Sequence, residues 1–231
     1  MSEWRKGRAG YAVEELDAIR RCQHGDMDAL ESLVERYHAN ALRLAYLLTG
    51  DKALAEDIAQ DSFLQAYRNI SRFEVGRPFA PWLYRIVTNI ARERLRSRRR
   101  LREIALDGLL APGEGAAGSA VGEADVVRAL QSSAIDPAVQ AERAEQRDAI
   151  LQALGALTHK QREAIILRYY LGCDDHACAS IAGCREGAFR VRLHGALRAL
   201  KHIIRQRYPW LLPTGSSSAD SLEVTRHVAI E

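Results

Sequence analysis

The sequence predicts an all-α protein made of two small helical domains joined by a flexible linker. Apolar residues recur at helical spacing through the first half, a segment rich in Gly and Ala interrupts this pattern, and a helix-turn-helix pattern follows. These observations place the first domain at residues 14–104, the linker at 105–135, the second domain at 136–208 and a C-terminal tail at 209–231.

Length and composition exclude several classes of protein. At roughly 100–200 residues per domain, 231 residues allow one or two domains. The 47% of hydrophobic residues excludes a chain that is disordered throughout. No apolar run approaches the ~20 residues of a membrane-spanning helix, and no apolar stretch near the start resembles a signal peptide. We therefore expect a cytoplasmic protein without a membrane partner.

Two helices and a loop are predicted before residue 82. One apolar stripe at spacings of three and four predicts the first helix, through Leu30, Leu33, Val34, Tyr37, Ala41 and Leu44. Gly50 suits the end of that helix, and Asp51 suits the N-cap of the next one. The second helix has its apolar side within residues 55–67. A loop at 73–81 follows, in which Pro81 suits the first turn of a third helix.

The third helix has a basic face opposite its apolar stripe. Steps of three and four place five side chains on one ridge: Trp82, Arg85, Asn89, Arg92 and Arg96. Eight arginines and one acid lie within residues 85–102, whereas acids dominate residues 105–148. Arginines neutralise phosphates, and Asn and Trp can hydrogen-bond to or stack on bases, so the ridge indicates nucleic-acid binding. The alternative is a solvated charged face.

The second half contains a helix-turn-helix pattern over residues 173–200. Ala179 lies at the expected contact between the helices, and Gly183 lies in the turn. The predicted core positions are Cys178, Ile181, Cys184, Phe189 and Leu193. The second helix should expose Arg185, Glu186, Arg190, Arg192 and His194, which suit a recognition helix in the major groove.

Both halves together resemble the sigma-70 family. The motifs AEDIAQDSFL and WLYRIVTN are similar to region 2, and QREAIILRYY followed by the helix-turn-helix is similar to region 4. No segment resembles region 1.1 or a folded region 3. This layout resembles that of the extracytoplasmic-function (ECF) sigma factors. The resemblance covers residues 14–208.

The resemblance implies a promoter-specificity subunit of bacterial RNA polymerase. Asp57, Gln60 and Asp61 share one helix face and match the ridge that binds core RNA polymerase. Residues matching the −10 DNA contacts are Phe73, Trp82, Arg85, Asn89, Arg92 and Arg96, and the loop at 73–78 matches the segment that captures a flipped base. Residues matching the −35 contacts are Arg185, Glu186, Arg190, Arg192 and His194. An anti-sigma factor is a further partner that the family implies.

The sequence also allows two alternatives to a sigma factor. One is a stand-alone helix-turn-helix regulator. The other is a zinc or thiol sensor, because Cys173, His176, Cys178 and Cys184 lie within twelve residues. Cys178 and Cys184 map to core positions, where cysteine acts as a small hydrophobe, and we expect Cys22 to be a packing residue. We therefore predict no metal, no cofactor and, since no catalytic motif is present, no enzyme activity.

Overall fold

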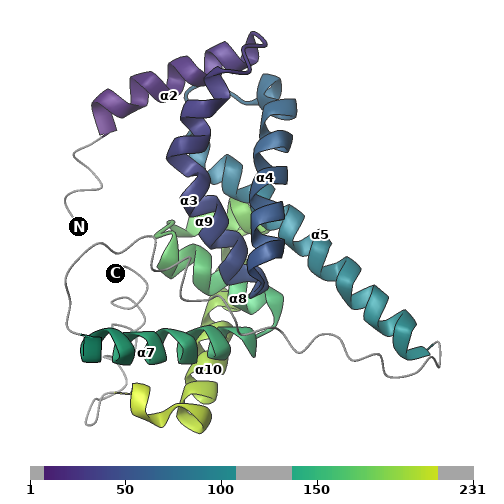
Figure 1. The fold of residues 1–231 in the computed structure, drawn as a ribbon, viewed down its shortest axis with the longest axis vertical. Coiled ribbons are helices and arrows are strands. Elements are labelled where there is room, and N and C mark those ends of the chain that lie inside the picture. The colour runs from purple at the N-terminus through teal and green to yellow at the C-terminus, as the bar shows by residue number, and fades with distance from the viewer. Residues whose placement is uncertain (1–7, 108–136, 213–231) are drawn as a thin grey trace. The chain divides into compact units, whose positions relative to one another are not determined.

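The computed structural model describes residues 8–107 and 137–212, and every regular element in these ranges is a helix (Figure 1). The chain divides into two compact units, with the boundary within the third predicted helix, after Arg96. Each unit has its own buried residues and is described separately. Within the described ranges, no helix has both the length and the apolar character needed to cross a membrane.

The first unit contains helices α2 to α4 and the part of α5 up to Arg96. Their bounds are α2 Arg8–Gln23, α3 Ala29–Thr49, α4 Lys52–Asn69 and α5 Phe79–Asp107, with a 3-10 turn, η1, at Ile70–Arg72. Helix α2 packs against α3, and α3 and α4 lie side by side (Figure 1). The α3–α4 turn is made by Gly50, whose φ of 70° is easily adopted only by glycine, and α4 begins directly after Asp51 as predicted.

The core of this unit follows the predicted stripes, with one addition. The buried residues of α3 include Leu30, Leu33, Tyr37, Ala41 and Leu44. The addition is α2, which the sequence analysis did not identify as a helix and which contributes Ala18, Ile19 and Cys22 to the core. Cys22 is 3% exposed, so the prediction of a packing residue is confirmed.

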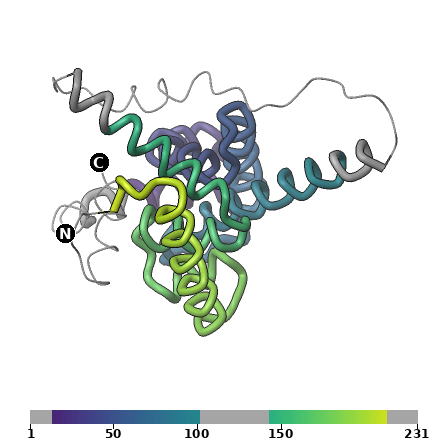
Figure 2. The backbone as a smooth tube through the Cα atoms, turned by 90° about the horizontal axis from the view of Figure 1, so that it is seen from below, coloured from purple at the N-terminus to yellow at the C-terminus, as the bar shows by residue number. Residues whose placement is uncertain are grey.

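The second unit is organised around helix α10. Its elements are α7 Pro137–Gly155, α8 His159–Ile165, a π-helical segment η2 at Ile166–Tyr170, α9 Asp175–Ala182, α10 Glu186–Arg207 and a 3-10 turn, η3, at Pro209–Leu211. Helices α7, α8 and α9 all contact α10, which Figure 2 shows as one long yellow-green helix. One buried cluster joins α7, α8 and α10 through Ala153, Leu154, Leu157, Ile165, Ala196 and Leu200.

The α8 region differs from the sequence prediction in one respect. Thr158 forms the predicted cap, as a capping box with Gln161. However, the single helix expected up to Gly172 is α-helical only to Ile165 and continues as a π-helical segment. Side-chain periodicity does not reveal a change from i→i+4 to i→i+5 hydrogen bonds, so this segment could not be predicted.

The predicted linker is mostly outside the described residues. Helix α5 continues to Asp107, three residues into the segment assigned to the linker, and α7 begins at Pro137 as expected. The tail beyond Leu212 also lies outside the described residues.

Candidate nucleic-acid interface

Helix α5 has one apolar buried face and one cationic exposed face. The buried side consists of Leu83, Ile86, Val87, Ile90 and Ala91. The opposite side carries the predicted DNA-contacting residues, of which Arg85, Asn89 and Arg96 are exposed and Trp82 and Arg92 are half-buried. The helix is thus anchored by its apolar side and presents three arginines, an amide and an indole from the other.

An internal hydrogen bond orients Asn89 on this face. Arg92 Nη1 donates to Asn89 Oδ1 over 2.9 Å. Because Oδ1 is engaged by a neighbour on the same helix, the NH₂ group is the part of the amide left to donate to a base.

An aromatic cluster holds the start of α5 and the preceding loop. The Phe73 ring centroid lies 5.1 Å from that of Trp82 and 5.6 Å from that of Phe79. Gln23 on α2 fixes the other end of this region, because its Nε2 donates to the carbonyl oxygens of Ile70 (3.0 Å) and Phe73 (2.8 Å). The loop is therefore connected to both α2 and α5.

The structure places the Phe73 side chain in the core rather than on the surface. Phe73 is 5% exposed, so in this conformation its ring positions the loop and does not present a face to a base. The exposed part of the loop follows it: Glu74 and Arg77 form an ion pair of 2.7 Å around Gly76, and Val75 is exposed. Spacing alone could not distinguish Phe73 from its exposed neighbours.

Helix α4 carries the predicted polymerase-binding ridge. Asp57 and Gln60 are exposed, and Asp61 is half-buried. Asp61 Oδ2 accepts a hydrogen bond from Arg94 Nη2 of α5 at 2.6 Å, an ion pair that the sequence analysis missed. Leu64 continues the same ridge at the next helical step and is 42% exposed, so the ridge combines acidic and apolar groups.

The helix-turn-helix prediction is confirmed by the geometry of α9 and α10. Asp174 caps α9 by accepting from the backbone N–H of Ala177 over 2.7 Å. Gly183 ends α9 with a φ of 67°, and Ala179 is 3% exposed at the packed side of the helix. Phe189 of α10 is fully buried. Cys184 and Leu193 were predicted as core residues; both are half-buried, and Leu193 packs against the cluster that joins α7, α8 and α10.

The outer side of α10 carries the predicted −35 residues. Arg185 precedes the helix as its N-cap residue and is exposed, as are Arg190 and His194. Glu186 and Arg192 are half-buried, less accessible than predicted. Val191, between two arginines, is 75% exposed; the sequence analysis missed it, although an apolar residue outside the core stripe was the available signal.

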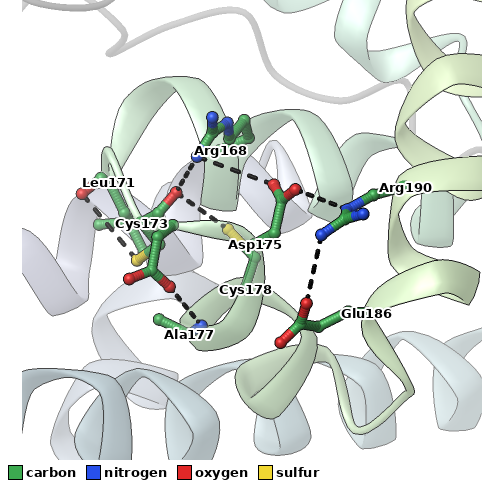
Figure 3. Close-up of polar contacts among 9 residues, drawn as sticks. Arg168, Leu171, Cys173, Asp175, Ala177, Cys178, Glu186 and Arg190 are labelled. Carbon is green, nitrogen blue, oxygen red and sulfur yellow. Dashed lines mark hydrogen bonds and ion pairs between the residues drawn. The ribbon is translucent and has the colours of Figure 1, made fainter.

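Arg190 is held by carboxylates from two helices (Figure 3). Its Nε donates to Asp175 Oδ2 of α9 over 2.8 Å, and its Nη2 donates to Glu186 Oε2 over 3.3 Å. Asp175 also faces Arg168, whose Nη1 lies 3.8 Å from Asp175 Oδ1 and donates to the Cys173 carbonyl oxygen over 2.8 Å. The direction of the Arg190 guanidinium therefore depends on α9 and on the loop before it.

The four candidate zinc ligands, Cys173, His176, Cys178 and Cys184, do not form a metal site among the described residues. Cys178 is fully buried, Cys173 and Cys184 are half-buried, and His176 is exposed. Within the described part of the chain, no three His, Cys, Asp or Glu side chains are arranged to hold a metal ion. The zinc form of the sensor alternative therefore has no geometric support.

Comparison with known proteins agrees with this architecture. The family model described as Sigma-70 region 2 matches residues 33–101, and the model described as Sigma-70, region 4 matches residues 147–200. The two matches fall on the two helical units in this order. The fold and the exposed cationic helices define a two-domain, all-α DNA-binding transcription factor.

Relatives and solved structures are consistent with one family. The chain is 29% identical over 187 residues to the ECF RNA polymerase sigma factor SigW of Bacillus subtilis, covering 81% of this chain and 95% of SigW. It is 29% identical over 191 residues to the RNA polymerase sigma-H factor of Pseudomonas aeruginosa, covering 81% and 92%. The sigma factor RpoE of Bartonella quintana, solved with the anti-sigma factor NepR, has a similar fold with a TM-score of 0.55 at 23% identity, covering 76% and 96%. The chain belongs to the sigma-70 family as an ECF sigma factor, a factor that directs transcription initiation.

Proposed function

We propose that this sigma factor binds core RNA polymerase through α4, melts the −10 element with α5 and its preceding loop, and reads the −35 element with α10. The observation that carries the proposal is the two-sided helix α5, which buries Leu83, Val87 and Ala91 and exposes Arg85, Asn89 and Arg96. A face of this kind supports simultaneous contact with phosphates and with unstacked bases. No covalent step is needed, since the polymerase supplies the chemistry.

The α4 ridge suits a protein partner better than DNA. Asp57, Gln60 and Asp61 supply oxygen acceptors, and the exposed Leu64 adds apolar area that becomes buried on binding. Carboxylates would repel DNA phosphates. We therefore assign this ridge to core RNA polymerase.

The α10 surface suits the major groove of duplex DNA. Arg185, Arg190, Arg192 and His194 supply donors, and Glu186 can accept from a cytosine amino group. Because the Nε and one Nη of Arg190 are held by carboxylates, its remaining donors are pre-oriented toward a base.

Two further properties follow from this assignment. We propose that the protein acts in the cytoplasm, where core RNA polymerase and promoter DNA are found. The sigma factor RpoE of Bartonella quintana is solved in complex with the anti-sigma factor NepR. We propose that an anti-sigma factor likewise binds this chain.

The test is run-off transcription with bacterial core RNA polymerase on a promoter library, with and without this protein. We expect protein-dependent transcripts that share two upstream motifs. Asn89→Ala should reduce open-complex formation about tenfold, and Arg190→Ala should relax base preference at one −35 position. Arg20→Ala, which removes an exposed arginine on α2 outside these faces, is the matched control and should leave both unchanged.

The result that would overturn the proposal is also clear. Absence of protein-dependent transcripts, together with absence of core polymerase binding in a pull-down, would favour a stand-alone helix-turn-helix regulator.

A further inference from the structure

Two of the four cysteines lie close together at the start of α9 (Figure 3). Cys173 lies in the loop before the helix, and Cys178 is the fourth residue of the helix. The Cys178 Sγ lies 3.4 Å from the Cys173 carbonyl oxygen. The Cys173 Sγ lies 4.0 Å from the Leu171 carbonyl oxygen, so the Cys173 side chain must leave this contact for the two sulfur atoms to bond. Cys184 lies beyond the other end of α9.

The surroundings favour reaction at Cys173 rather than at Cys178. Cys173 is half-buried and so accessible to a small oxidant, whereas Cys178 is fully buried. The neighbouring Cys178 thiol lowers the pKa of Cys173, and the Arg168 guanidinium acts in the same direction, against burial and Asp174. The same thiol interaction and burial raise the pKa of Cys178. The thiolate, which is the reactive form, is therefore favoured at the more accessible sulfur.

The cysteine pair is connected to the DNA-reading helix by a short chain of contacts. The Cys173 carbonyl oxygen accepts from Arg168, Arg168 faces Asp175, and Asp175 holds Arg190 over 2.8 Å. Asp175 lies between the two cysteines in sequence. A disulfide requires its own distances and dihedral angle between Cys173 and Cys178. Forming it would therefore change the backbone between the two cysteines and move the Asp175 carboxylate that orients Arg190.

We propose that Cys173 and Cys178 form an oxidation site that reacts with a peroxide, closes to a disulfide and thereby weakens −35 recognition by α10. The Cys173 thiolate attacks one peroxide oxygen, the O–O bond breaks, and Cys173 sulfenic acid and hydroxide form. The Cys178 sulfur then attacks the sulfenic sulfur, the S–O bond breaks, and hydroxide leaves with the Cys178 proton as water. The peroxide is reduced by two electrons, and a dithiol reverses the disulfide.

The oxidation is tested on the full chain without DNA. The protein is treated with hydrogen peroxide, desalted, alkylated and mapped by peptide mass spectrometry. We expect a Cys173–Cys178 linkage in the wild type and in the matched control Cys184→Ser, reversed by dithiothreitol, and none in Cys173→Ser or Cys178→Ala. Irreversible oxidation of Cys173 without a linkage, or a linkage that uses Cys184, would overturn the site.

The consequence for promoter recognition rests on the proposed function and is measured separately. Oxidised and reduced protein, freed of peroxide, are each added to core RNA polymerase on a promoter that requires its −35 element. We expect about tenfold fewer transcripts from the oxidised wild type, restored by dithiothreitol, and no change for Cys178→Ala. Equal transcription by both forms of a protein with the linkage would overturn the coupling to Arg190. If the reduced protein gives no transcripts, the proposed function fails while mass spectrometry still decides the disulfide.

Discussion

At the scale of single residues, Arg190, which we propose contacts the −35 element, shows how a neighbouring helix can hold a side chain in one orientation. A free arginine samples many rotamers, and ordering it on binding costs conformational entropy. Here Asp175 and Glu186 accept hydrogen bonds from two nitrogen atoms of Arg190 before any DNA is bound, which reduces this cost. Asp175 therefore acts as a positioning residue, whose effect should appear in base preference more than in stability.

We predict that Asp175→Asn relaxes base preference at one −35 position and lowers transcription about three- to tenfold, because the neutral amide holds Arg190 less firmly. The free energy of unfolding should fall by no more than about 1 kcal/mol, since the ion pair is partly exposed. Transcription from a −35 library and urea unfolding measure the two effects. Asp174→Asn is the control, because asparagine still caps α9; an equal loss of base preference there would contradict the prediction.

Asp61 is a second residue for which structural and functional roles can be separated. It pairs with Arg94, and the two side chains are 41% and 52% exposed. Ion pairs this exposed contribute roughly 0–1 kcal/mol to the free energy of unfolding. The Asp61–Arg94 pair is therefore of little importance for stability.

We predict that Asp61→Ala weakens binding to core RNA polymerase about tenfold while changing the free energy of unfolding by less than about 1 kcal/mol. Arg94→Ala removes the same ion pair but keeps the carboxylate, so it should bind core polymerase nearly as well as the wild type. Affinity is measured by fluorescence anisotropy with labelled protein. Equal weakening by both variants would assign the effect to the ion pair instead.

At the scale of elements, the two glycines of the helix-turn-helix differ in what their backbone requires. Gly183 ends α9 with a φ of 67°, which residues with a Cβ adopt at a cost. Gly195 lies within α10 and has no positive φ, and a Cβ there would contact nothing within 4 Å. The first glycine is needed for the turn, whereas the second weakens its helix.

We predict that Gly195→Ala raises the free energy of unfolding of the second unit by about 0.5–1 kcal/mol, and that Gly183→Ala lowers it by about 1 kcal/mol or more. Urea unfolding followed by circular dichroism measures both. Changes of the same sign in the two variants would contradict this interpretation of the backbone.

At the scale of the whole molecule, two separate sets of buried residues imply two cooperative units. The second unit has Phe189 and the cluster shared by α7, α8 and α10. The first has its own core, in which Leu44 is fully buried. Domains with separate cores open independently.

We predict that Phe189→Ala, which should cost about 3–5 kcal/mol, removes hydrogen-exchange protection from α8–α10 and leaves that of α3 and α4 intact. Leu44→Ala, which should cost about 2–5 kcal/mol, should produce the reverse pattern. Exchange followed by mass spectrometry measures both variants. Loss of protection throughout the chain in either variant would show that the units unfold together.

The fold class, the order of the two units and most of their helices could be predicted from local sequence patterns. The stripe from Leu30 to Leu44, the α3–α4 turn at Gly50 and the helix-turn-helix around Ala179 and Gly183 were predictable because periodicity and turn residues are local signals. Helix α2 was missed because its apolar residues are spread around the helix and form no clear stripe.

The contacts between side chains of different helices could not be predicted and are known from the folded structure alone. The structure placed the Phe73 ring in the core and paired Asp61 with Arg94 across 33 residues. It also joined Asp175 to Arg190. These contacts depend on how helices pack and where loops turn back, and spacing along one helix carries no information about a neighbour on another.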